Sequence, residues 1–228
     1  MKAKLGAVLM SAVLAAGCAS TPPSQSGFLG DYSQLQPAPD REGVMIWVDQ
    51  STDLRPYTKL MFDPVQVLAT PGPDQAQLPP DVLQRIGGQF QASLTRELQP
   101  AYQVVTMPGP DVLRVRSAIT HIQPVKPDPG AIDFMPIKAA YNVGREATVG
   151  GPRVAEMQAE LEVLDPSGKR VVAATVTRKG DHELPQGERI TWESLPPITD
   201  YWARNFRTRL DQLRGATQQT PVASENQH

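Results

Sequence analysis

The chain is poor in cysteine, in aromatic residues and in long apolar runs. Cys18 is the only cysteine among 228 residues, so no disulfide can form within the chain. Aromatic residues make up 6% of the sequence against 23 prolines, which predicts many loops. With 40% hydrophobic residues over the length of one domain, we expect a sizeable core that holds the fold without cross-links.

Charge of one sign is not in large excess either. The formal net charge is −2, and loss of the first 17 residues, which include Lys2 and Lys4, would make it about −4. Nucleic-acid binding needs a concentrated basic face, which this balance does not supply. We therefore expect no nucleic-acid partner, and the sequence contains no internal repeat.

The single cysteine closes an apolar N-terminal segment. Lys2 and Lys4 precede an apolar stretch over residues 5–13 that is too short to span a bilayer. The run Leu14-Ala15-Ala16-Gly17-Cys18 resembles the lipobox of bacterial lipoproteins, in which a signal peptidase cuts before a lipidated cysteine. The alternative is an ordinary secretory signal whose cysteine is accidental.

The lipobox resemblance implies a signal peptide over residues 1–17 and acyl chains, such as palmitate, on Cys18. Two or more acyl chains hold a protein durably at a membrane. Ala15 stands where leucine is commoner, and Ala19 and Ser20 follow the cysteine without an aspartate. By analogy with the sorting rule of enteric bacteria, this implies the periplasmic face of the outer membrane, with the lipid as the membrane anchor.

The rest of the chain is expected to contain a tether, one folded domain and a tail. Residues 18–40 form the lipidated tether, which includes an aromatic strap (residues 27–32) with too many apolar groups for a free linker. The strap either docks on its own domain, over a sheet edge or core rim, or contacts a partner. A single periplasmic domain follows over residues 41–214, and residues 215–228 are expected to be disordered.

Hydrophobic periodicity predicts an α+β domain. Apolar residues four apart predict helices over about 80–98 and 198–213, the second capped by Thr199 or Asp200 and ended by Gly215. Strands are expected over residues 44–48, 60–67 with a break at Pro64, 102–106, 112–122, 154–164 and 172–176. The expected fold class is α+β, an antiparallel sheet of about five to six strands with the two helices packed on one face.

Two details of this pattern make specific predictions. Apolar residues at odd positions of 154–164 alternate with glutamate and glutamine, which predicts one buried face and one solvent-exposed acidic face. A turn over residues 165–168 then leads into the strand's hairpin partner. Gly87 and Gly88 interrupt the first helix at a cost of about 1 kcal/mol each, which predicts close packing of this helix on the sheet.

Reactive groups do not form a recognisable catalytic pattern. His121 shares a strand face with Ile119 in the expected strand and is best explained as a structural histidine. Residues 181–183 (Asp-His-Glu) fit a solvated loop better than a metal site, and residues 144–151 fit a glycine-rich turn better than a phosphate loop. No nucleophile elbow occurs. We expect no enzyme activity, no metal and no cofactor, although spacing alone cannot nominate or exclude a pair of carboxylates.

One further segment, residues 131–143, concentrates apolar side chains between proline- and glycine-rich flanks. It either fills the core as a short helix or forms a flap that contacts a partner or lipid. The candidate partner-contact residues are Phe28, Leu29, Tyr32, Phe134, Met135 and Tyr141.

The lipobox, residues 26–32 and residues 57–65 together resemble a family of bacterial lipoproteins known as domain of unknown function 3313. The resemblance runs from Cys18 to about Leu213 and implies an envelope lipoprotein, with no functional residue to transfer beyond Cys18. We therefore expect a lipid-anchored, non-catalytic module that binds another envelope protein or a glycan. The alternatives are a periplasmic carrier of a small molecule or lipid, and an envelope hydrolase.

Overall fold

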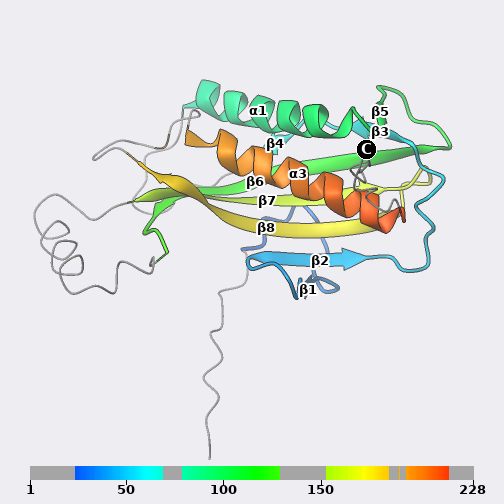
Figure 1. Cartoon of the computed structure of the whole chain (residues 1–228), viewed down its shortest axis with the longest axis horizontal. Helices are drawn as coiled ribbons and strands as arrows, with labels where there is room; N and C mark the ends of the chain where they lie inside the picture. Colours follow the sequence, from blue (N-terminus) through cyan, green and yellow to red (C-terminus); the bar gives the residue numbers. More distant parts are fainter. Residues whose placement is uncertain (1–23, 69–78, 129–152, 185–189, 191–193, 216–228) are drawn as a thin grey trace, which may run out of the picture.

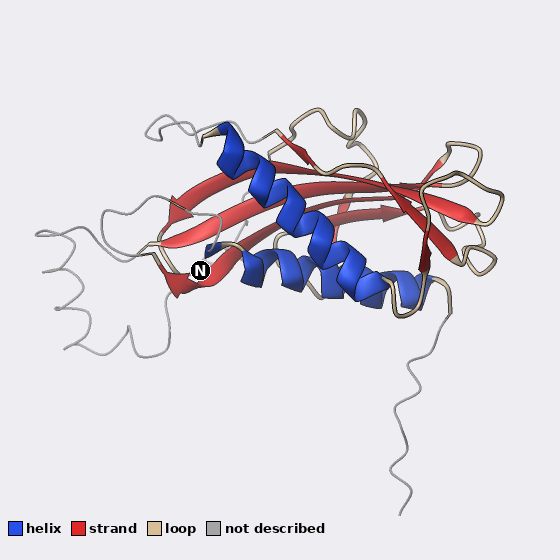
Figure 2. Cartoon of the chain, turned by 90° about the horizontal axis from the view of Figure 1, so that it is seen from above, coloured by secondary structure: helices blue, strands red, loops and turns tan. Residues whose placement is uncertain are grey.

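The computed structural model describes residues 24–68, 79–128, 153–184, 190 and 194–215. Two helices and one eight-stranded sheet make up the regular structure of these ranges (Figures 1 and 2). In chain order the elements are β1 (Gln36–Pro37), β2 (Val44–Val48), β3 (Lys59–Phe62), β4 (Gln66–Val67), α1 (Pro80–Leu98), β5 (Gln103–Val104), β6 (Val112–Val125), β7 (Val154–Leu164), β8 (Arg170–Glu183) and α3 (Pro196–Leu213). The predicted α+β class is confirmed.

The sheet is larger than predicted, and it is mixed. Its strand order is β1-β2-β8-β7-β6-β3-β5, with β4 also paired to β6. The central strands are antiparallel, but β3 and β4 pair with β6 in parallel, and so do β3 and β5. Parallel neighbours need a long crossover connection, and α1 supplies it between β4 and β5. The prediction of an antiparallel sheet therefore holds for the pairs from β1 to β6, but it was wrong for β3, β4 and β5 and in the number of strands.

Helix α1 forms where the periodicity predicted it. Its residues Ile86, Phe90, Leu94 and Leu98 are buried against the sheet. A Cβ atom added to Gly87 would lie 3.2 Å from Cγ2 of Val67, so this glycine does allow the helix to approach β4 closely. No atom comes within 4 Å of a Cβ placed on Gly88, which therefore has no packing reason of this kind.

Helix α3 begins earlier than its predicted caps. Its N-cap is Leu195 and makes no side-chain capping bond, so the prediction of Thr199 or Asp200 as the cap was wrong. Thr199 lies within the first turn and donates to the Pro196 carbonyl at 3.1 Å. The helix ends as predicted, because Gly215 follows it with φ of 69°.

The two faces of the sheet are covered by different parts of the chain. The helices pack on one face over a core that includes Leu113, Ile119 and Met157. On the other face, Leu29 and Leu35 pack with Ala173 and are flanked by the partly buried side chains of Met45 and Trp47. This second layer comes from the segment before β2, which folds back across the long strands.

Two predictions about the long strands were wrong, one because of this second layer and one because of an irregularity in β6. The even-numbered face of β7 is not solvated, since Gln158, Glu160 and Glu162 are 3%, 0% and 2% exposed. His121 does not share a face with Ile119, because the register shifts between them and His121 lies opposite Gln158, on the face away from the helices.

Several predicted features lie outside the described residues. These are the signal peptide, Cys18, the apolar segment 131–143 with Phe134, Met135 and Tyr141, the glycine-rich segment 144–151 and the tail beyond residue 215. In the part of the chain that is described, neither helix has the length and apolar character needed to cross a bilayer.

Candidate functional site

The buried acidic face of β7 is the most unusual feature of the described structure. Glu160 and Glu162 point away from the helices, and their side chains are covered by residues 24–32. Removing carboxylates from water costs several kcal/mol each unless partners compensate. The contacts of these two glutamates therefore show what the N-terminal segment does in the fold.

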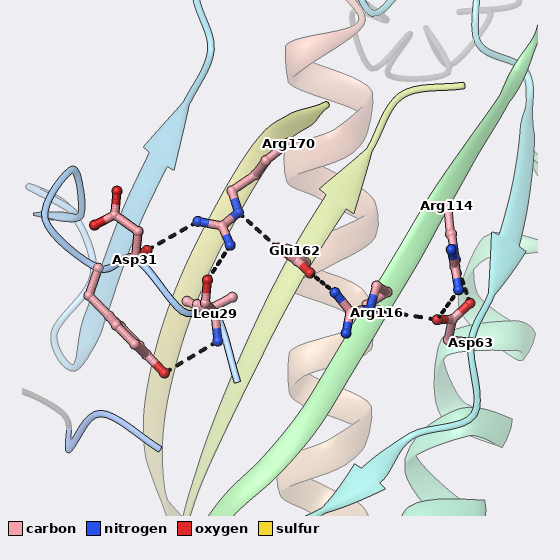
Figure 3. Close-up of polar contacts among 8 residues, drawn as sticks. Leu29, Asp31, Asp63, Arg114, Arg116, Glu162 and Arg170 are labelled. Carbon is pink, nitrogen blue, oxygen red and sulfur yellow. Dashed lines mark hydrogen bonds and ion pairs between the residues drawn. The ribbon is translucent and has the colours of Figure 1, made fainter. Parts of the chain in front are cut away.

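Glu162 lies between two arginines from the neighbouring strands (Figure 3). Arg116 on β6 donates to one carboxylate oxygen, and Arg170 on β8 donates to the other at 2.8 Å. Arg170 also donates to the backbone carbonyls of Leu29 and Asp31, the latter at 3.1 Å. The guanidinium group of Arg170 thus joins the strap directly to the buried carboxylate.

Glu160 is held by Tyr32 of the strap and by Ser26, the residue just before the strap. The backbone N–H of Ser26 donates to one of its oxygens at 3.0 Å, and the Tyr32 hydroxyl donates to the other at 2.6 Å. The same hydroxyl accepts the N–H groups of Gly27 at 2.8 Å and Leu29 at 3.3 Å. Burial, followed by the hydrogen bond to Glu160, raises the pKa of Tyr32, which keeps the hydroxyl protonated as a donor.

The polar contacts extend to both ends of this surface. Gln158 bonds to the backbone and hydroxyl of Ser24, which is where the described chain begins. At the other end Arg114 donates to both oxygens of Asp63 at 2.8 Å, and Arg116 lies 3.6 Å from the same carboxylate (Figure 3). Every carboxylate in this network faces a donor, so the arrangement acts as a clamp between the N-terminal segment and the sheet.

Three of the six predicted partner-contact residues come together in this layer. Leu29 is 2% exposed and packs into the sheet, whereas Phe28 and Tyr32 are partly buried. The Phe28 ring lies 5.3 Å from Cζ of Arg116, a cation–π contact. The strap therefore docks on its own domain, and the partner contact of Phe28, Leu29 and Tyr32 stays a prediction.

Sequence reasoning missed a second feature, an apolar cavity of about 100 Å³ on the helix side of the sheet. It lies between α3 and strands β2, β7 and β8, with walls that include Leu161, Val172, Trp202 and Phe206. Arg41 and Arg209 belong to the same lining, together with Asn205 and Tyr201. The pattern of each segment showed apolar faces, but only the pairing of β2 with β8 brings these faces together.

The remaining described candidates, His121 and Asp181, lie apart from the clamp. His121 is partly exposed on the strap side of the sheet, and Asp181 forms an exposed ion pair at 3.6 Å with Arg178. Over the described ranges, no group of three histidine, cysteine or acidic side chains lies close enough to hold a metal ion.

Comparison with known proteins finds no match among curated proteins. Solved structures that are similar in part include a PelC dodecamer from Paraburkholderia phytofirmans, with 11% identity over 70% of this chain and 96% of that one and a TM-score of 0.36. The DUF330 protein XCC0632 from Xanthomonas campestris has 10% identity over 71% and 89%, with a TM-score of 0.39. A DUF4136 family protein from Bacteroides thetaiotaomicron has 9% identity over 75% and 96%, with a TM-score of 0.33.

A family model matches most of the sequence. It covers residues 24–206, from the first serine of the clamp to the middle of α3, and it is described as Protein of unknown function (DUF3313). The chain belongs to the DUF3313 family.

Proposed function

We propose that this protein is a lipid-anchored lipoprotein on the periplasmic face of the outer membrane, and that its domain is a non-catalytic module that binds another envelope protein or a glycan. The observation that carries the proposal is the docking of the chain onto the sheet from Ser24 onward. Cys18 precedes Ser24 by only six residues, which span at most about 20 Å at about 3.3 Å per residue. The anchor would hold the domain close to the bilayer.

The same geometry gives the domain an orientation. The tether leaves from the sheet face that carries the strap, and α1 and α3 cover the opposite face. With a short tether, the strap side faces the bilayer and the helices face the periplasm. A partner in the periplasm would then meet the exposed side of α1, which includes Arg85 and Ala92.

The anchor is tested by replacing the lipidated residue. Cys18→Ser should abolish the added acyl mass and leave the chain unprocessed or unlipidated. The neighbouring change Ser20→Ala should keep the acyl mass and the fractionation with membranes. Wild-type protein without acyl mass that fractionates as soluble periplasmic material would refute the lipoprotein assignment.

The orientation and the partner are tested in intact cells. A photo-crosslinking residue at Ala92 on α1 should give reproducible adducts with one envelope component, and the same residue at Gln34, which is exposed on the strap side, should not. Adducts with that component at Gln34 alone would reverse the proposed orientation. Adducts at neither site in cells that carry the lipidated protein would count against a binding module.

A periplasmic carrier is the second candidate, because the cavity beside α3 is apolar and lies apart from the strap. A carrier needs a site that shields part of an apolar ligand from water. Neither candidate requires a catalytic group.

A further inference from the structure

The cavity beside α3 reaches the protein surface. Val44 and Ile46 on β2, together with Phe206 and Leu213 on α3, line it and remain partly exposed. Figure 1 shows why: α3 crosses β8, and no described helix lies over β2, the strand next to the short edge strand β1. The result is an apolar slot with one open side, bordered by a strand and a helix that do not close on each other.

The size of the slot limits what it can hold. Its volume of about 100 Å³ is smaller than the roughly 150 Å³ cavity that accommodates a benzene molecule in an engineered core. A bulky or two-chain ligand would not fit. A single linear hydrocarbon chain can enter it in part, with the rest of its length covered by the partly exposed apolar walls.

Two arginine side chains, Arg41 and Arg209, belong to the lining of the slot, and Arg41 has buried nitrogen atoms without a hydrogen-bond acceptor. The Arg41 side chain is 19% exposed, and its Nε and Nη2 atoms are buried without a hydrogen bond to any described residue. Its nearest carboxylate, on Asp40, is 66% exposed and lies 3.5 Å from Nε, which is an ion pair and not a hydrogen bond. Arg209 adds a second guanidinium group to the lining, and its Nη1 atom donates to Gln212 at 2.7 Å.

Buried guanidinium nitrogen atoms without hydrogen-bond acceptors are costly, and a carboxylate matches the planar set of donors of a guanidinium group. We propose that the slot beside α3 binds a free fatty acid, with its acyl chain among the apolar side chains and its carboxylate against Arg41 and Arg209. This assignment deepens the carrier candidate of the proposed function. It depends neither on lipidation of Cys18 nor on an envelope partner.

The test uses the full processed chain as purified from cells, mixed with phosphatidylcholine nanodiscs whether or not it carries acyl chains. The probe is a palmitate analogue that carries a photoactivatable diazirine in its chain, and the adducts are mapped by mass spectrometry of peptides. We expect saturable adducts on peptides that contain Phe206 or Leu213, and an excess of palmitate should remove them.

Two variants and one control assign the site. Ala174 lines the slot and is partly exposed, so the ring of Ala174→Phe blocks the slot and should abolish the adducts. Arg41→Gln should weaken competition by palmitate about tenfold, the loss expected for one charged hydrogen bond. Arg55→Gln removes an arginine that is 75% exposed and outside the slot, so labelling should not change. Each variant's thermal midpoint is measured alongside.

Several outcomes would overturn the assignment. These are a lack of saturable adducts on the slot peptides, equal labelling of folded Ala174→Phe, and equal competition in Arg41→Gln and Arg55→Gln. A photoactivatable lysophosphatidylglycerol that labels the slot where the palmitate analogue does not would replace the carboxylate with a phosphate. Loss of acyl mass on Cys18, or of partner crosslinks, would contradict the proposed function but would not change the expected labelling of the slot.

Discussion

Buried tyrosine hydroxyls bonded to carboxylates recur in this molecule, and each ties distant parts of the chain together. Tyr32 connects the strap to Glu160 on β7. Tyr102 is 1% exposed and donates at 2.6 Å to Asp211 on α3, whose other oxygen accepts Arg207 at 2.6 Å. Burial, followed by the hydrogen bond to Asp211, raises the pKa of Tyr102 to about 12.

The raised pKa of Tyr102 predicts a loss of stability in alkali. The unfolded chain releases this proton near pH 10 and the folded chain near pH 12, so the contribution is complete below pH 10 and disappears as the pH rises to 12. Denaturant unfolding of wild type and Tyr102→Phe at intervals over this range should show a steeper decline for wild type. Parallel curves for the two proteins would mean that Tyr102 titrates normally.

Sequence reasoning at this scale identified side-chain directions but not surroundings. Alternation along β7 correctly separated Glu160 and Glu162 from the apolar face. It could not show that residues 24–32 cover that face, because two-residue periodicity contains no information about contacts 128 or more residues away in sequence. His121 was assigned to the wrong face because one irregular residue in β6 inverts the alternation.

Among the elements, length determined what could be predicted. Helix α1 has 19 residues and β7 has 11, so several periods of their patterns are visible. Strands β4 and β5 have two residues each and lie within the strands predicted over 60–67 and 102–106, whereas β1, also of two residues, was predicted as part of the tether because two residues show no repeating alternation. The parallel pairing of β3 and β4 with β6 follows from α1 as a crossover, which local patterns do not reveal.

The two adjacent glycines of α1 give a matched pair of substitutions. Gly88→Ala adds a methyl group in open space and should stabilise the protein by about 1 kcal/mol, or roughly 2–4 °C in thermal midpoint. Gly87→Ala makes the same change in helix propensity but presses against Val67, with contacts of 3.2 Å to Cγ2 and 3.4 Å to the Val65 carbonyl oxygen. Its midpoint should rise less or fall. Equal gains would show that α1 does not rest closely on β4.

For the whole molecule, the strap makes the N-terminal segment part of the fold and not only a link to the membrane. Leu29 and Leu35 build a second, smaller core on the outer face of the sheet, and β1 extends the sheet beyond β2. In the proposed function this is how a lipid anchor would fix the orientation of the domain, since a flexible segment of the same length would let it rotate.

This role predicts a loss of global stability when the strap is altered. In the chain from Ala19 onward, Leu29→Ala should cost about 2–5 kcal/mol because it leaves a cavity, and Tyr32→Phe about 1–3 kcal/mol because Glu160 loses a buried donor. Gln34→Ala changes an exposed neighbour and should leave the denaturant midpoint unaltered.

Combining Phe28→Ala with Tyr32→Ala should also lower the midpoint, because both side chains pack on the second core around Leu29 and Leu35. If that double variant unfolds with the wild-type midpoint, the packing of Phe28 and Tyr32 contributes nothing to the fold, and these two side chains are free for a partner.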